Sequence, residues 1–138
     1  MHEPVWITTE LIEAIHERQL SEHGGPGGIR DRGMLESALA RARQKYAYEP
    51  TSDLPTLAAA YAFGIATNHP FIDGNKRTAA VACELFLELN DYTLVAEDAD
   101  MYPVFLSLAT GQLTEAALAD WLRANSRPQQ VSEPADNY

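Results

Sequence analysis

The chain has 138 residues, the length of a single globular domain. Its 10 basic and 20 acidic residues give a formal net charge of −10. This charge argues against a general nucleic-acid binder or a protein held on anionic lipid, because both need a basic surface. The single cysteine, Cys83, permits no internal disulfide, and neither a signal peptide nor a membrane-crossing apolar run is present. We therefore expect a cytoplasmic protein.

Apolar residues recur at helical spacing along most of the chain, which predicts an all-α domain. A first helix is expected to begin at Thr8 or Thr9 and to end before the glycine-rich segment 24–28. A second helix is expected at 31–43. A third helix, apolar almost all round, follows the N-cap residue Asp53. Three more helices are expected at 75–89, 98–109 and 114–124.

Three segments lack the helical pattern. Tyr46 and Tyr48 alternate within 44–51, which predicts a short β-ribbon that either docks a target by strand addition or simply covers the core. A brief extended segment is expected at 92–95. After Asn125 the sequence becomes polar, so we expect one domain over 1–125 and a flexible tail over 126–138.

The loop before the fourth predicted helix indicates an anion-binding site. Gly74 lets the backbone approach a ligand, and Asn75 can cap the helix and donate to an oxygen. Lys76, one of only two lysines, and Arg77 place positive charge at a helix start, where the helix dipole disfavours it. This arrangement predicts that a bound anion compensates, with phosphate as the natural candidate.

Two more side chains of this loop suggest group-transfer chemistry. His69 can accept a proton from a hydroxyl, and Asp73 can hold Mg²⁺ that bridges phosphate oxygens. Phe71, between them, is expected to anchor the loop on the core. A base, a metal carboxylate, an anion site and cations are what phosphoryl or nucleotidyl transfer needs. Zinc is not expected, because paired ligand spacing is lacking at the other three histidines, His2, His16 and His23.

The segment 69–77 resembles the signature of the Fic/Doc (Fido) superfamily, whose loop reads His-x-Phe-x-Asp/Glu-Gly-Asn-Gly-Arg. Lys76 stands where the Fic pattern has its second glycine, and Ala80 stands where a further arginine usually follows. Both differences match the death-on-curing (Doc) branch, whose loop ends Asn-Lys-Arg-Thr-Ala. The likeness extends from Trp6 to about Arg123.

This resemblance implies a Fido-type domain of about six helices with a short β-ribbon flap, and an enzyme that uses ATP and Mg²⁺. In such a domain His69 would be the catalytic base, Asp73 would bind Mg²⁺ and Phe71 would anchor the loop. The ATP phosphates would be bound by Gly74, Asn75, Lys76 and Arg77. In the Doc branch the γ-phosphate goes to a Ser or Thr hydroxyl of translation elongation factor Tu, and the antitoxin Phd neutralises the toxin.

Two alternatives stay open at this point. Gly74 follows the Fic pattern, where the Doc loop can carry alanine, so the group transferred to the protein hydroxyl is either phosphate or AMP. The other alternative is a module that binds a nucleotide or a partner without turnover. The intact set of His69, Asp73 and Asn75 argues against this last reading, because a non-catalytic scaffold needs none of them.

Overall fold

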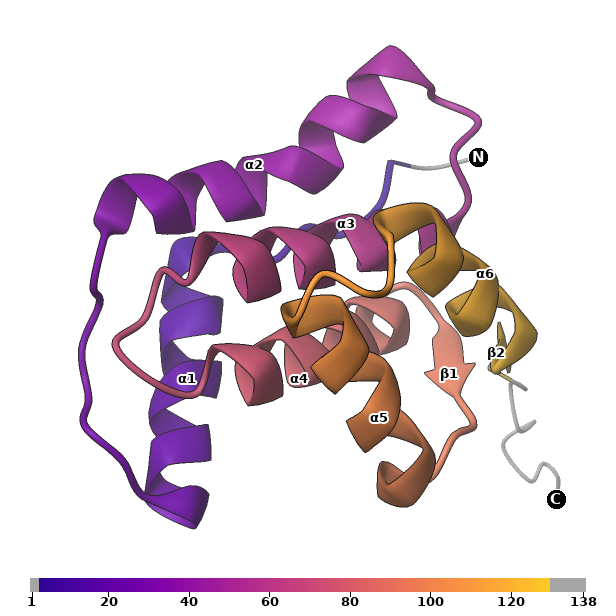
Figure 1. Ribbon diagram of the computed structural model, residues 1–138. Coiled ribbons are helices and arrows are strands. Elements are labelled where there is room, and N and C mark those ends of the chain that lie inside the picture. Colours follow the sequence, from indigo (N-terminus) through magenta and orange to yellow (C-terminus); the bar gives the residue numbers. More distant parts are fainter. Residues whose placement is uncertain (1–2, 130–138) are drawn as a thin grey trace, which may run out of the picture.

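The computed structural model describes residues 3–129, which form six helices and one small sheet (Figure 1). The predicted class, an all-α domain with a short β-ribbon, is confirmed, although the ribbon does not lie at 44–51. Within these residues, no helix is long and apolar enough to cross a membrane. His2 lies outside the described residues. The helices are α1 (Thr9–His23), α2 (Arg32–Tyr48), α3 (Leu54–Asn68), α4 (Asn75–Leu89), α5 (Asp98–Ala109) and α6 (Glu115–Ala124).

Four of these helices begin at a side-chain cap. In each, a hydroxyl or carboxylate oxygen accepts a hydrogen bond from a backbone N–H in the first helical turn, which the helix itself leaves unpaired. The caps are Thr8, Asp31, Asp53 and Thr114. The starts of α1, α2, α3 and α6 therefore follow from local chemistry alone.

The β-ribbon predicted at 44–51 is wrong. Helix α2 continues through this segment to Tyr48, because no glycine or proline interrupts it before Pro50. Tyr46 lies one turn after the buried Ala42, and its ring meets that of Trp6 edge-on with centroids 5.5 Å apart. The Tyr48 side chain is 91% exposed. The two tyrosines thus occupy different faces of a helix instead of alternate faces of a strand.

The small sheet forms near the end of the described chain. β1 (Tyr92–Leu94) lies in the predicted extended segment and pairs antiparallel with β2 (Ser126–Pro128), with Thr93 opposite Arg127. Residues 126–128 were expected to belong to a flexible tail, and this part of the expectation is wrong. The backbone of β1 needs hydrogen-bond partners, and the chain leaving α6 supplies them. The rest of the expected tail, 130–138, lies outside the described residues.

Helix α3 is central to the fold, as its apolar sequence predicts. It packs against α2, α4, α5 and α6, and most of its side chains are buried (Figure 1). Helix α2 comes close to α3 at Gly64, where an added Cβ would lie 3.0 Å from the Cα and 3.1 Å from the carbonyl oxygen of Ala38. Glycine at this position lets the two backbones approach directly.

A methyl group at Gly64 should therefore destabilise the domain. Alanine in place of glycine normally favours a helix interior by about 1 kcal/mol. In Gly64→Ala, the clash with the Ala38 backbone should outweigh that gain and lower the free energy of unfolding by about 1–2 kcal/mol. Urea denaturation measures the change, with the exposed α2 variant Ser37→Ala as a control that should stay within about 0.5 kcal/mol of wild type. A more stable Gly64→Ala protein would contradict the close packing.

Asp53 joins the start of α3 to α6. Its carboxylate caps α3 and accepts hydrogen bonds from Arg123 of α6, with Nε to Oδ2 at 2.7 Å and Nη2 to Oδ1 at 3.2 Å. The hydrogen bonds from the Arg123 guanidinium are the largest cause that lowers the pKa of Asp53 to about 2 from 3.8. One carboxylate thus caps the N-terminus of α3 and also binds α6 through Arg123.

The contribution of Asp53 to stability should depend on pH. Since the folded-state pKa lies below the unfolded value, the contribution is complete above about pH 3.8 and is lost as the pH falls through about 2. Asp53→Asn keeps a capping oxygen but not the charge. The difference in melting temperature between wild type and Asp53→Asn should be present at pH 5 and absent below pH 2. The exposed α2 variant Glu36→Gln serves as the control, and a pH-independent difference for Asp53→Asn would contradict the ion pair.

Candidate functional site

The loop that connects α3 to α4 begins and ends in the left-handed backbone region. His69 has φ 49° and closes the C-terminus of α3, where its N–H donates to the Ile65 carbonyl at 3.3 Å. Gly74 has φ 78° and precedes the first residue of α4. Because these two residues reverse the chain within a few positions, the loop is presented at one end of two buried helices (Figure 1).

Phe71 fixes the middle of this loop. Its side chain is 1% exposed, and its backbone forms a bridge with Ile29 from the segment between α1 and α2. The Ile72 N–H donates to the Gly28 carbonyl at 3.2 Å, and the Arg30 N–H donates to the Pro70 carbonyl at 2.7 Å. A short antiparallel contact therefore supports the loop along its length.

Asn75 uses its side chain to close the loop. Its Oδ1 accepts from the Phe71 N–H at 3.0 Å, and its Nδ2 donates to the Phe71 carbonyl at 2.9 Å. The amide is therefore engaged with the loop backbone, and no side chain caps α4. The backbone N–H groups of the first turn of α4 are left for a ligand, and a helix N-terminus of this kind favours an anion.

His69 and Asp73 present free functional groups. Both residues are exposed, and within residues 3–129 neither the imidazole nor the carboxylate forms a hydrogen bond or ion pair. An added Cβ at Gly25 would lie 2.5 Å from Oδ2 of Asp73, so only glycine permits this position of the carboxylate. The described chain holds no group of three or more His, Cys, Asp or Glu side chains for a metal ion. A metal at Asp73 would therefore need further ligands from a substrate and water, which is the usual arrangement for Mg²⁺.

The two cations at the start of α4 have no acidic partner in the described part of the chain. Lys76 places Nζ 4.7 Å from the centroid of the Tyr102 ring on α5, and Arg77 is exposed. The ion pairs of residues 3–129 involve other basic residues, such as Arg41 and Arg123. The positive charge of Lys76 and Arg77 adds to the helix dipole at the start of α4, so the local field favours an anionic ligand.

These side chains surround one open cavity of about 460 Å³, to which α5 contributes Tyr102. The loop and the start of α4 supply the rest of its lining: His69, Ile72, Asp73, Gly74, Asn75, Lys76 and Arg77. The predicted base, carboxylate, anion site and cations are thus brought together. Phe71 lies beneath them in the core.

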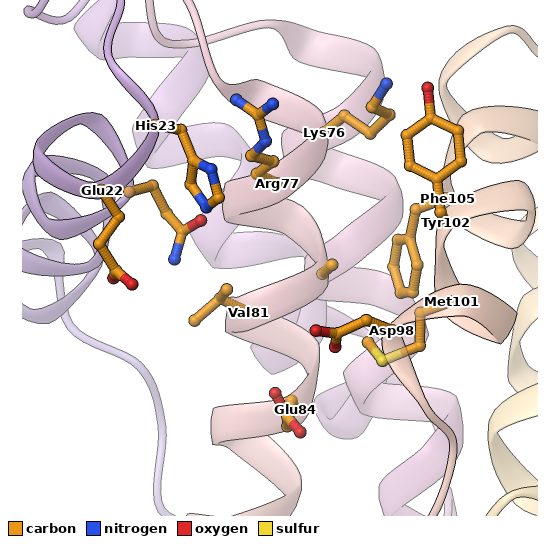
Figure 2. Close-up of a pocket in the computed structure, with 12 residues that line it drawn as sticks. Glu22, His23, Lys76, Arg77, Val81, Glu84, Asp98, Met101, Tyr102 and Phe105 are labelled. Atoms are coloured by element: carbon orange, nitrogen blue, oxygen red, sulfur yellow. The ribbon is translucent and has the colours of Figure 1, made fainter.

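A second cavity of about 360 Å³ continues along α4, between α1 and α5. It shares Lys76, Arg77 and Tyr102 with the first cavity. Figure 2 shows the two cations at one end and Glu84 at the other. Burial, followed by repulsion from Glu88 and Asp98, raises the pKa of Glu84. This second cavity therefore has a cationic end and an acidic end.

Sequence similarity to known proteins identifies the family. A sequence model described as the Fic/DOC family matches residues 6–87, more than half of the chain. The chain belongs to this family.

Two curated relatives carry the Doc name. Over 117 residues the chain is 34% identical to "Protein kinase doc" of Escherichia phage P1, and this alignment covers 85% of the chain and 92% of the relative. Over 75 residues it is 40% identical to "Toxin Doc" of Mycolicibacterium smegmatis, with 54% of the chain and 58% of the relative covered. The resemblance to the Doc branch is therefore confirmed.

The hydrogen bonds that two residues, Arg30 and His16, donate around the loop between α3 and α4 are absent from the sequence prediction. Arg30 donates from Nε to the His69 carbonyl at 2.6 Å and from Nη2 to the Asn68 carbonyl at 2.8 Å. His16 of α1 donates from Nε2 to the Asp73 carbonyl at 2.7 Å. The sequence does carry a signal for His16, since it lies one turn after Ile12 and next to Ile15 on the buried stripe of α1, where an imidazole needs a partner.

Cys83 has no part in the site. It is fully buried on α4, and burial, with a smaller contribution from Glu84, raises the pKa of its thiol. The prediction of a core cysteine is confirmed, and the group is inert because the thiolate is the reactive form.

Removal of the Asn75 amide should loosen the loop. Asn75→Ala leaves both the N–H and the carbonyl of Phe71 without their partner, so we expect a loss of about 1–3 kcal/mol in the free energy of unfolding. Urea denaturation measures this loss. The control is Asn125→Ala, which removes one hydrogen bond, from Nδ2 to the Trp121 carbonyl, and should cost about 1 kcal/mol. Equal losses in the two variants would contradict the double contact of Asn75.

Proposed function

We propose that this Fic/Doc protein is a Doc-type toxin that transfers the γ-phosphate of ATP to a Ser or Thr hydroxyl of a protein. The observation that carries the proposal is one open cavity that brings together His69, Asp73 and the uncapped start of α4. Lys76 and Arg77, which have no acidic partner within residues 3–129, line the same cavity. The similarity to a phage protein named as a protein kinase favours phosphate as the transferred group.

The chain would divide the reaction among these groups. The exposed imidazole of His69 accepts the proton of the target hydroxyl, whose oxygen attacks the γ-phosphorus. The bond from that phosphorus to the oxygen bridging to the β-phosphate breaks, and ADP leaves with the electron pair. The first-turn N–H groups of α4, with Lys76 and Arg77, hold the phosphate oxygens and offset the negative charge that spreads over them.

Asp73 fits a role as the Mg²⁺ ligand of this reaction. Its carboxylate is exposed and unpaired within residues 3–129, and it lies in the same cavity as the proposed phosphate site. Bound Mg²⁺ would neutralise charge on the phosphate oxygens. The close approach of Gly25 limits the directions that the carboxylate can take, which would favour one placement of the ion.

Nucleotidyl transfer is the second candidate. Gly74 adopts φ 78° at the start of α4, a conformation that suits the glycine of the Fic pattern. In that reaction the target oxygen attacks the α-phosphorus and pyrophosphate leaves, while His69 has the same role as base. Lys76, in place of the Fic glycine, occupies space and adds charge beside the phosphates, and this favours the phosphate-transfer alternative.

We further propose two protein partners and a cytoplasmic site of action. By family resemblance the target is translation elongation factor Tu, and the inhibitor is a Phd-like antitoxin. The net charge of −10 suits an antitoxin segment that carries basic residues, because opposite charges favour association.

Labelled ATP distinguishes these functions. The purified protein is incubated with Mg²⁺, elongation factor Tu and ATP labelled at the γ- or the α-phosphate. Protein-bound γ label is expected, whereas α label would indicate nucleotidyl transfer. His69→Ala should lower the labelling rate about 10²–10⁴-fold, as for the loss of a general base. Asp73→Asn should also lower it and raise the Mg²⁺ requirement, while the exposed α5 variant Asp100→Asn should label like wild type.

Two outcomes would contradict the proposed enzymatic activity. The first is the absence of both labels. The second is growth arrest by His69→Ala that equals the arrest by wild type, which would favour a module that acts by binding.

A further inference from the structure

His16 is a buried polar side chain on the inner face of α1. Its exposed fraction is 3%, and it lies among apolar residues of the stripe that includes Ile12 and Ile15. An imidazole in such a position costs free energy unless it forms a hydrogen bond. An apolar side chain would fill the same volume without this cost, so the hydrogen bond of His16 calls for an explanation.

Three observations place the His16 ring against the 71–74 segment of the loop. The ring stacks on Phe71, with centroids 3.8 Å apart and planes 9° apart. Its Nε2 lies 2.7 Å from the Asp73 carbonyl oxygen. The same Nε2 atom lies 3.7 Å from the position that a Cβ at Gly74 would occupy. A carbonyl oxygen can only accept, so Nε2 carries a hydrogen and donates it.

The fold alone does not require this hydrogen bond. Asp73 is an exposed residue, and the hydrogen bond to its carbonyl oxygen is only partly buried. Phe71 is already fixed by the Ile29 bridge and by the Asn75 amide. The specific effect of the imidazole is therefore on the backbone of Asp73 and Gly74, at the point where the loop enters α4.

We propose that His16 is a positioning residue of the transfer reaction, holding Asp73 and Gly74 so that carboxylate and helix N-terminus face the same phosphate group. This inference rests on the proposed function of the loop. At the other end, the Arg30 guanidinium holds the His69 carbonyl, so donors from two separate parts of the chain fix the two ends. A shift of about 1 Å in such groups is enough to lower a rate by about 100-fold.

Two substitutions separate the hydrogen bond from the stacking contact. His16→Phe keeps an aromatic ring over Phe71 but has no donor for the Asp73 carbonyl. His16→Gln loses the ring but places an amide nitrogen close to the position of Nε2. Leu118→Ala, on α6 and away from the loop, is the control for a general loss of stability.

The expected result is a loss of kcat in His16→Phe of about 10- to 100-fold, with an unchanged KM for the protein target. His16→Gln should recover much of this loss, and Leu118→Ala should keep the wild-type kcat at a temperature where it is folded. Hydrogen–deuterium exchange gives a readout without ATP or Mg²⁺. Amides of 72–76 should exchange faster in His16→Phe than in wild type or His16→Gln, while those of α6 should not change.

The inference is wrong if His16→Phe has the kcat and the loop exchange of wild type, or if His16→Gln and His16→Phe are equally impaired. An inactive wild-type protein has a different meaning. It contradicts the proposed function, and with it the catalytic part of this inference, whereas the exchange experiment still tests whether His16 orders the loop.

Discussion

The anchoring of the loop between α3 and α4 is the constraint on which the site depends. Helix α3 ends and α4 begins at this loop, and the Phe71 ring is buried in the core, where it stacks on His16. The Asn75 amide closes the loop on Phe71, and the segment before α2 pairs with its backbone. With its backbone satisfied in this way, the loop can expose His69 and Asp73 without unfolding. Rigid support beneath and free functional groups above are what a preorganised site requires.

The electrostatics of the chain divide into a global and a local part. The acidic total charge disfavours polyanions such as nucleic acid, yet Lys76 and Arg77 add positive charge to the uncapped start of α4. A short anion that enters this site meets two cations and a helix dipole, whereas a long one would meet an acidic surface as well. On the proposed function, a preference for a compact phosphate ligand would follow from where the charges lie, not from their sum.

Most of the features that the sequence predicts correctly depend on residues close together in the chain. Caps such as Thr8 and Asp53 determine the helix starts, and the signature 69–77 identifies the family. The ribbon predicted at 44–51 is wrong because two alternating tyrosines fit a strand as well as the end of a helix. The lack of glycine or proline before Pro50 and the packing of Tyr46 on Trp6 favour the helix. The partners of the loop, Arg30 and His16, were missed because they are 39 and 57 residues away in sequence from the carbonyls that they bind. No local pattern encodes such distant contacts.

The long sequence separation of these contacts has a consequence for folding. The hydrogen bonds of Arg30 and His16 form only after α1 and the following segment have docked on the loop, and closing such large chain loops is slow compared with forming the helices themselves. A chain in which α3 and α4 have paired but α1 has not still lacks the supports at both ends of the loop. On the proposed function, a chain in which α1 has not yet docked would therefore have lower activity than the folded protein.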